Sequence, residues 1–438
     1  MHAVSCNMSH RETMKNKQYR PRLQDSLISE LLSAAGAVCL EGPKWCGKTW
    51  SAEHHAASVI SLGNPEGNFN NRMMAQMNPS AALEGERPHL VDEWQEVPAI
   101  WDAVRYRVDE IGERGLFLLT GAATPVHKGI MHSGAGRIVS LRMRPMSLFE
   151  SGDSSGQVSL YSLTEGELPA QATGEVSLMR LIELVMRGGW PGNLGLSLRQ
   201  AVKLPMRYLD AVLKDDLYRM DGVRRDLGKM KLLLRSLARN ESTLVGNAAL
   251  KRDIKAHDDD DLGVNTIAGY LDILARLFLT DNQPPFPLKL RSKAAVQQAE
   301  KRHLADPSLA CALLQATPQK LLRDLTTFGF LFESMVERDL RVYAESREGN
   351  LYHYRDDKGK EIDAIVEWSD GRWIAVEIKL GAHEIEAAAQ NLLSIQRDIL
   401  AYNPENAPSA LLVVCGMSHS AYKRPDGVMV VPPTALRD

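Results

Sequence analysis

The architecture of the N-terminal part follows from one glycine-rich stretch, Gly42-Pro43-Lys44-Trp45-Cys46-Gly47-Lys48-Thr49. It fits the pattern G-x-x-x-x-G-K-[ST] and lies between the apolar run Ala37–Leu40 and a helical segment that begins at Lys48. The glycines let backbone N–H groups point at phosphate oxygens, and the helix that follows adds the positive end of its dipole. Lys48 would reach the β- and γ-phosphates, and Thr49 would coordinate Mg2+. The stretch therefore predicts a nucleotide-binding loop, with ATP and Mg2+ as cofactors.

Short apolar runs alternate with helical segments on both sides of this loop. The alternation predicts βαβ units around a mostly parallel sheet, from Tyr19 to about Arg144. We assign residues 19–150 to a nucleotide-binding α/β domain and residues 1–18 to a flexible tail. The runs expected to form strands are Ala37–Leu40, Val59–Leu62, His89–Val91, Leu116–Leu119 and Ile138–Leu141.

Two carboxylates, Asp92 and Glu93, follow the third run, as in a Walker B segment. Asp92 would hold Mg2+ through water, and Glu93 would orient and polarise the attacking water. Two acids in this place can also be a solvated strand end, but their position downstream of the loop favours the catalytic interpretation. The fourth run ends at Thr120, whose hydroxyl would either sense the γ-phosphate or lytic water or cap the next turn.

Composition bounds the class of protein. At roughly 100 to 200 residues per domain, 438 residues give about two to four domains. The hydrophobic share of 44% and the charged share of 24% are ordinary for a soluble globular protein. A net charge of −3 disfavours a wholly basic nucleic-acid binder but leaves room for local basic patches.

Cysteine usage and hydropathy indicate the cellular compartment. The five cysteines lack CxxC spacing, so we expect neither a zinc site nor a disulfide framework. No apolar run approaches the roughly 18 residues of a membrane span. We therefore expect a cytoplasmic protein without a membrane partner. The cysteines are Cys6, Cys39, Cys46, Cys311 and Cys415.

The middle of the chain is predicted to be helical. Glu150–Gly174 is polar and aperiodic, which indicates a linker or an exposed excursion, and residues 151–225 are assigned to this linker and a helical segment. Three helices from Lys229 onward predict a winged-helix module over residues 226–290. The acidic run Asp258–Asp261 would repel phosphate, so the module is expected to pack between the two ends rather than to read DNA. A basic cluster would contact phosphates or form a solvated face: Lys289, Arg291, Lys293, Lys301 and Arg302.

Residues 291–438 are predicted to form a second mixed α/β region. The expected elements are a helix at Lys320–Ala344, strands at Glu361–Trp368, Trp373–Leu380 and Ala410–Val414, and a helix at His383–Tyr402. The first two strands read as a hairpin, and their apolar faces coincide only if the connecting loop has an odd number of residues. This register places Asp363 opposite Glu377 or Lys379.

Asp363, Glu377 and Lys379 would then converge on one face of the hairpin. The two carboxylates would be Mg2+ ligands, and Lys379 would steady the hydroxide or the charge developing on phosphorus. The alternative is a hairpin whose outer face carries ordinary solvated charges. Cleavage would also need a basic groove, for which only scattered candidates exist, among them Arg355 and Lys358.

The whole pattern from about Tyr19 onward resembles a prokaryotic family of AAA-type ATP-binding proteins whose C-terminal half is an uncharacterised domain similar to PD-(D/E)XK nucleases. The resemblance rests on Gly42–Thr49, Leu90–Glu93, Leu118–Gly121, Gly136-Arg137, Arg144–Glu150, Gly188–Pro191, Tyr208–Leu217 and Gly329–Glu333. It implies an AAA-like ATPase core, a winged-helix segment and a nuclease-like fold. It also implies Glu333 as a further metal ligand, and Arg137 as a finger on a γ-phosphate in cis or in trans. A surface ion pair is the other interpretation of Arg137.

Together these features predict an ATP-binding and ATP-hydrolysing protein whose nucleotide state controls a nuclease-like C-terminal domain acting on DNA or RNA. The alternative is a nucleotide-dependent switch or scaffold whose C-terminal domain binds a partner without catalysis. A homo-oligomer would be compatible with either. A helicase-like motor is disfavoured because the sequence shows no second motor core and no repeated aromatic and basic tract.

Overall fold

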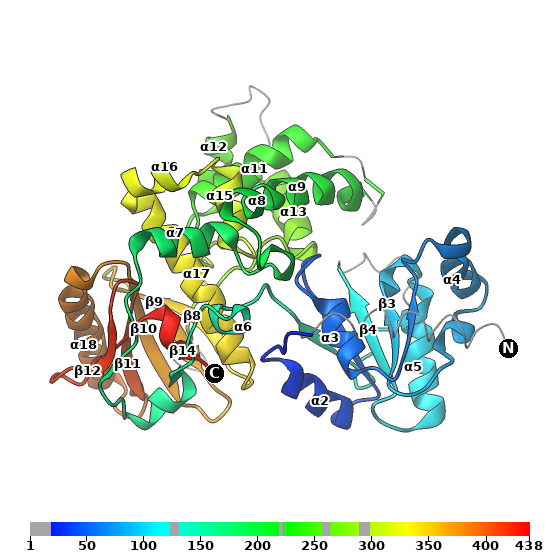
Figure 1. Ribbon diagram of the computed structural model, residues 1–438, viewed down its shortest axis with the longest axis horizontal. Helices are drawn as coiled ribbons and strands as arrows, with labels where there is room; N and C mark the ends of the chain where they lie inside the picture. The colour runs from blue at the N-terminus through cyan, green and yellow to red at the C-terminus, as the bar shows by residue number, and fades with distance from the viewer. Residues whose placement is uncertain (1–18, 123–130, 219–221, 224, 256–262, 289–297) are drawn as a thin grey trace. The chain divides into compact units, whose positions relative to one another are not determined.

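The computed structural model describes residues 19–122, 131–218, 222–223, 225–255, 263–288 and 298–438. The chain divides into two compact units (Figure 1). The first is built mainly from residues up to Arg144, and the second mainly from residues beyond it. The expected tail, the acidic run Asp258–Asp261 and the first members of the basic cluster, Lys289, Arg291 and Lys293, lie outside the described residues.

The first unit contains a five-stranded parallel sheet with the strand order β2-β3-β4-β1-β5. Each strand coincides with one of the five apolar runs, which confirms the prediction of a parallel α/β domain. Their bounds are β1 Ala37–Glu41, β2 Ser58–Ser61, β3 His89–Asp92, β4 Phe117–Gly121 and β5 Ile138–Arg142.

Helices cover both faces of this sheet, because its central strands are apolar on both sides. On one face Val38 and Leu40 pack with Ile28 of α2 (Asp25–Ala34) and Ala52 of α3 (Lys48–His55). On the other face Cys39 packs with side chains of α5 (Ala99–Ile111), and α4 (Glu66–Met77) lies on that side too. Each fully buried aliphatic side chain contributes about 1.5–3 kcal/mol to folding.

Strand order brings three strand ends together. Strand β4 lies between β1 and β3, and the register pairs Leu40 with Thr120 and Val91 with Leu119. The segments that follow β1, β3 and β4 therefore leave the same edge of the sheet. In open parallel sheets ligands bind at this carboxyl edge.

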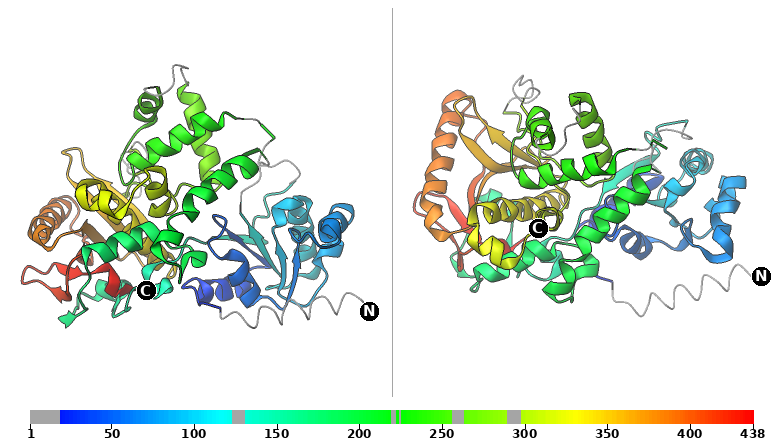
Figure 2. Two further views of the ribbon diagram at one scale, coloured as in Figure 1. Left: turned by 45° about the horizontal axis from the view of Figure 1, so that its top comes forward. Right: turned by 90° about the horizontal axis from the view of Figure 1, so that it is seen from above.

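The second unit contains a seven-stranded mixed sheet with the order β7-β12-β13-β11-β10-β9-β8. Helix α18 (Ile385–Tyr402) packs on one side of this sheet and α17 (Leu325–Glu345) on the other (Figures 1 and 2). The strands are β7 Gln171–Ala172, β8 Asn350–Arg355, β9 Glu361–Glu367, β10 Trp373–Lys379, β11 Ala410–Cys415, β12 Ser420–Lys423 and β13 Met429–Val431. A separate pair joins β6 (Val158–Ser159) to β14 (Leu436–Arg437).

The remaining helices form the middle of the chain. Three of them, the first of which contains Lys229, lie where the sequence predicts three helices. The segment after them forms antiparallel bridges between Thr280 and Leu304 and between Gln283 and Lys301. The winged-helix assignment itself stays a prediction. The helices are α6 Leu148–Ser151, α7 Leu178–Arg187, α8 Leu198–Ala201, α9 Leu204–Ala211, α11 Leu227–Arg239, α12 Asn247–Lys255, α13 Val264–Arg276, α15 Pro307–Leu313 and α16 Pro318–Arg323.

Two expectations differ from the structure. The stretch Glu150–Gly174 is not a linker, because β7 pairs with β12, β6 pairs with β14, and Leu160 and Leu163 are buried. Strands of two residues are too short to show periodicity. The expected helix Lys320–Ala344 is divided into α16 and α17, since the Asp324 side chain accepts the Thr327 N–H and begins a new helix there.

Two further observations concern the surface and the thiols. No helix within the described ranges is both long enough and apolar enough to cross a membrane. Cys39, Cys46, Cys311 and Cys415 are buried free thiols.

Candidate functional site

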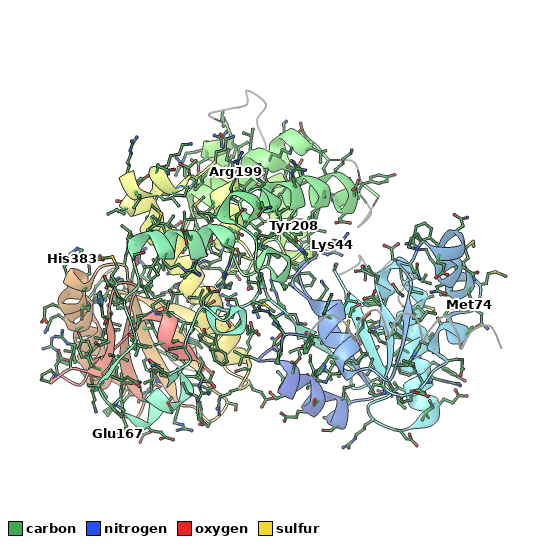
Figure 3. The ribbon with its side chains drawn as sticks, viewed as in Figure 1. Lys44, Met74, Glu167, Arg199, Tyr208 and His383 are labelled. Carbon is green, nitrogen blue, oxygen red and sulfur yellow. The ribbon has the colours of Figure 1, made fainter. Side chains whose placement is uncertain are left out.

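The loop after β1 is shaped by glycines. Gly42 has φ +151°, and a Cβ there would lie 2.1 Å from the Met143 carbonyl oxygen. Gly47, also left-handed, is the N-cap of α3. Cys46 is fully buried in the core beneath, whereas Trp45 is exposed; Lys44, just ahead of α3, is labelled in Figure 3. The loop is therefore anchored by Cys46 and lies tightly against the backbone of Met143, just after β5.

Lys48 begins α3 and is buried at the loop. Its ammonium donates to the carbonyl oxygens of Gly42 (2.9 Å) and Pro43 (2.8 Å). The loop's own backbone therefore holds this charge where the sequence expects phosphates to bind.

Asp92 connects the loop with three strands. Its Oδ1 accepts hydrogen bonds from Thr49 Oγ1 (2.8 Å) and Thr120 Oγ1 (2.7 Å), and its Oδ2 accepts one from Ser61 Oγ (3.0 Å). The two residues expected to hold Mg2+, Thr49 and Asp92, are thus in direct contact. The hydroxyl donors hold both carboxylate oxygens of Asp92 in place beside the first turn of α3.

Glu93 turns away from the strand with a left-handed backbone, φ +59°. Its N–H donates to Thr120 Oγ1 (3.1 Å), and Gln95 Nε2 donates to its carboxylate. Burial raises the pKa of Glu93, and the neighbouring charge of Asp92 raises it further. A carboxylate with a raised pKa is a better proton acceptor from water.

Four of these contacts were not predicted. Two of them join Thr120 to Asp92 and Glu93. Both roles expected for Thr120, sensing the γ-phosphate or capping the next turn, stay predictions. Ser61 and Gln95 were missed. The signal for Ser61 is its place at the end of β2, directly opposite Asp92 in the parallel register.

Arg137 is not part of this group. It precedes β5 and lies level with Ala37, at the amino edge of the sheet, whereas the loop follows the carboxyl end of β1. Its Nε donates to Asp109 (2.7 Å), and its side chain is 45% exposed. This placement contradicts a finger acting in cis and matches the surface ion pair. A role in trans stays a prediction.

The C-terminal hairpin has the predicted register. Trp373 pairs with Glu367 and Val376 with Ala364, which leaves an odd-numbered loop, 368–372. Asp363 Oδ2 accepts the N–H of Ile378 (2.8 Å) and the ammonium of Lys379 (3.1 Å).

Glu377 completes this group. Its Oε2 lies 2.7 Å from Lys379 Nζ, and its Oε1 accepts from Asn391 of α18 (2.9 Å). Burial and the neighbouring charge of Asp363 raise the pKa of Glu377 to about 7. Asp363, Glu377 and Lys379 converge as expected. Their side chains are 5% (Glu377), 17% (Asp363) and 25% (Lys379) exposed, so this face of the hairpin is largely covered rather than fully solvated.

Glu333 is held by a lysine that was expected on the surface. The Lys301 ammonium forms ion pairs with Glu333 and with Glu337 (2.8 Å), one turn further along α17. Burial raises the pKa of Glu333 to about 8 and that of Glu337 to about 7, although Lys301 opposes both shifts. Lys301 is therefore not part of a phosphate-contacting basic face. Arg302 is also engaged, with Val245 O and Asn247 Oδ1.

The acidic residues do not fit the metal site that the resemblance implies. Across the described residues, no cluster of at least three His, Cys, Asp or Glu side chains is arranged to hold a metal ion. Glu333, Asp363 and Glu377 are each bound by a lysine instead. The assignment of these three residues as Mg2+ ligands is thus not supported by their geometry.

Comparison with known proteins divides the chain into three matched regions. Residues 34–151 match an AAA domain family. Residues 179–320 and 328–436 match two domains of unknown function, DUF8612 and DUF4143. No curated protein matches the chain.

One solved structure that resembles the chain is the Walker-type ATPase of Pyrococcus abyssi. It has 13% sequence identity and a TM-score of 0.42, over 68% of this chain and 97% of that chain. The family match and the parallel sheet with its glycine-rich loop agree on the N-terminal part. Residues 34–151 form an AAA-type P-loop domain, the kind of domain that binds and hydrolyses ATP.

Proposed function

We propose that the N-terminal domain binds ATP with Mg2+ at Gly42–Thr49 and hydrolyses it. Backbone N–H groups of the loop and the Lys48 ammonium would hold the phosphates. Mg2+ would be held by Thr49 and, through water, by Asp92. The metal would neutralise charge on the transferred phosphoryl group, which protein side chains alone do poorly.

The observation that carries this proposal is the bonding of Asp92. This one carboxylate accepts hydrogen bonds from hydroxyl groups of α3, β2 and β4. These bonds fix its position before any ion binds, and a preorganised charge needs no rearrangement when the cation arrives.

Glu93 would orient and polarise the attacking water. Its backbone N–H donates to Thr120 and its carboxylate accepts from Gln95, so hydrogen bonds fix both the backbone and the side chain. The raised pKa lets the carboxylate take a proton as the water attacks.

We further propose that nucleotide state in this domain controls the C-terminal half. The nuclease hypothesis is supported by the convergence of Asp363, Glu377 and Lys379. The scaffold alternative, in which the C-terminal half binds a partner without catalysis, is favoured by a specific observation: the lysines Lys301 and Lys379 already bind these acids.

The ATPase proposal is tested by steady-state turnover and nucleotide binding. We expect Lys48→Ala to abolish nucleotide binding, and Glu93→Gln to bind ATP without turnover. Glu110→Gln, on the exposed end of α5, is the matched acid-to-amide control. Unchanged turnover in Lys48→Ala would overturn the assignment.

The control proposal is tested by incubating the protein with supercoiled, linear and single-stranded DNA and with RNA. Reactions contain Mg2+ or Mn2+, with and without ATP, beside Lys48→Ala and Glu377→Gln. Cleavage lost in both variants would establish the nuclease. Nucleotide-dependent changes in proteolysis of the C-terminal half without cleavage would establish the switch.

A further inference from the structure

Lys301 is held in place by its backbone. Its N–H and carbonyl both pair with Gln283, at 2.9 Å each. The fully buried Gln283 side chain in turn donates to the carbonyl oxygens of Tyr352 (2.7 Å) and Asp363 (3.2 Å), on the two adjacent strands β8 and β9. The segment that carries Lys301 is therefore fixed to the sheet, and its side chain enters the acidic region from a rigid backbone.

The ammonium of Lys301 is saturated. It has three N–H donors, and its acceptors are Glu333 Oε1, Glu337 Oε1 (2.8 Å) and the carbonyl oxygen of Asp363 (3.3 Å). The side chain is 9% exposed, and those of its acidic partners are 15% and 2% exposed. A buried cation with every donor used is a structural component rather than a mobile surface charge.

A second lysine completes the pattern. Lys379 lies between the carboxylates of Asp363 (3.1 Å) and Glu377 (2.7 Å). Asp363 Oδ2 also accepts the Ile378 N–H, and the other oxygen of Glu377, Oε1, accepts from Asn391. Four acids thus share two fixed ammonium groups.

We propose that Lys301 is the resident cation of this acidic cluster, occupying the charge position that a divalent metal would need beside Glu333. A divalent ion there would be repelled by an ammonium that cannot withdraw without leaving its own donors unpaired. The C-terminal domain therefore keeps Glu333, Glu337 and Asp363 in place without a metal.

This cation also joins two parts of the chain. Lys301 belongs to the region matched by one domain family, residues 179–320, and its acidic partners belong to the region matched by another, residues 328–436. Lys301 is thus a cross-link that fixes the first region to the sheet and α17 of the second. The inference does not depend on ATP hydrolysis, and it is tested without nucleotide.

The test is Mn2+ binding, followed by the electron paramagnetic resonance of free Mn2+, in metal-free and nucleotide-free protein. We expect no Mn2+ site at the Glu333 cluster in the unaltered chain, and one such site per chain in Lys301→Gln, with an affinity at least about tenfold above any binding by the unaltered chain, because a buried positive charge is gone. Adding Glu333→Gln to Lys301→Gln should remove that site. The matched control is Lys360→Gln, which removes a surface ammonium paired with Asp398 in the same sheet region.

Three results would overturn the proposal. They are a Mn2+ site in the unaltered chain that Glu333→Gln removes, a folded Lys301→Gln that binds no Mn2+, and equal binding by Lys301→Gln and Lys360→Gln. If Lys301→Gln does not fold, the unaltered chain and Glu333→Gln decide the question, and Lys301→Arg, which keeps the charge, should fold without binding Mn2+.

Discussion

Thr49 Oγ1 and Asp92 Oδ1 are joined by a hydrogen bond of 2.8 Å, which connects the first turn of α3 to the end of β3. Both groups are candidates for the Mg2+ shell, one directly and one through water. Their contact places the two halves of the ATP site in one network before any ion is present.

We expect Asp92→Asn to weaken the affinity for Mg2+ with ATP by about 10- to 100-fold, as loss of an outer-shell carboxylate does. The amide keeps the size of the side chain but loses the charge. Nucleotide binding without Mg2+ should change little. Fluorescent-nucleotide titrations with and without Mg2+ separate the two effects, and equal losses in both would contradict the assigned role.

Glu93→Gln should lower turnover by about 100- to 10,000-fold, the usual contribution of a positioned general base. The amide still accepts from Gln95 but cannot take a proton. ATP affinity should stay within a few fold of that of the unaltered chain. A variant that loses affinity and turnover together would indicate that Glu93 is structural.

Gly42→Ala tests the shape of the loop. The new Cβ would meet the Met143 carbonyl oxygen at 2.1 Å, and φ of +151° is strained for alanine. We expect the free energy of unfolding to fall by more than about 2 kcal/mol, with loss of nucleotide binding.

Gly136→Ala is the matched control for this substitution. It too has a positive φ, +77°, but nothing lies within 4 Å of its Cβ. It should lose only about 1 kcal/mol of backbone strain and keep nucleotide binding. Urea denaturation of both variants makes the comparison, and equal losses would mean that the Met143 contact is unimportant.

The site of the N-terminal domain could be predicted because its candidate phosphate-binding and Mg2+-binding residues lie at the ends of strands. The loop follows β1, and Asp92 ends β3 after three apolar or buried residues. The runs that predict strands are therefore directly followed by the residues expected to bind phosphate and Mg2+. Arg137 shows how far a motif match can mislead. It precedes β5, and in a parallel sheet this puts it at the opposite edge from a loop that follows β1.

Lys301 could not be predicted because its role depends on contacts distant in the chain. Lysines are rarely buried, so a lysine in an aperiodic segment is expected at the surface. The segment that carries Lys301 is fixed by Gln283, and its acidic partners lie on α17. No local sequence pattern predicts a contact between these distant parts of the chain. The short strands within Glu150–Gly174 were missed for the same reason, since their partners lie near the C-terminus.

His353 predicts a dependence of stability on pH. Burial and the charge of Lys301 together lower its pKa from 6.5 to about 4. Its Nε2 lies 3.1 Å from the Ala299 carbonyl oxygen. The unfolded chain therefore binds a proton between about pH 6.5 and 4 that the folded chain excludes. Relative to a chain that lacks this imidazole, His353 should therefore make stability fall as the pH is lowered through this window, by at most about 3 kcal/mol.

The matched variant is His353→Gln, whose amide can still donate to the Ala299 carbonyl but does not titrate. Its stability should decline less steeply than that of the unaltered chain over the same window, as measured by urea denaturation at several pH values. Parallel slopes for the two proteins would show that another group is responsible.

Arg338 provides the last prediction, because it is a buried guanidinium between two acids. Its Nη1 lies 2.8 Å from Asp306 and its Nη2 2.7 Å from Asp339. Asp306 also accepts the N–H of Gly189, and Asp339 that of Leu148.

We expect Arg338→Met to lower the free energy of unfolding by about 3–5 kcal/mol, since it leaves two buried carboxylates without their cation. Arg397→Met, at an exposed position of α18, should change it by less than about 0.5 kcal/mol. In the Asp306→Asn background the loss on removing Arg338 should shrink, because one of the two stranded charges is already gone. An equal loss in both backgrounds would show that Arg338 acts through packing rather than through its ion pairs.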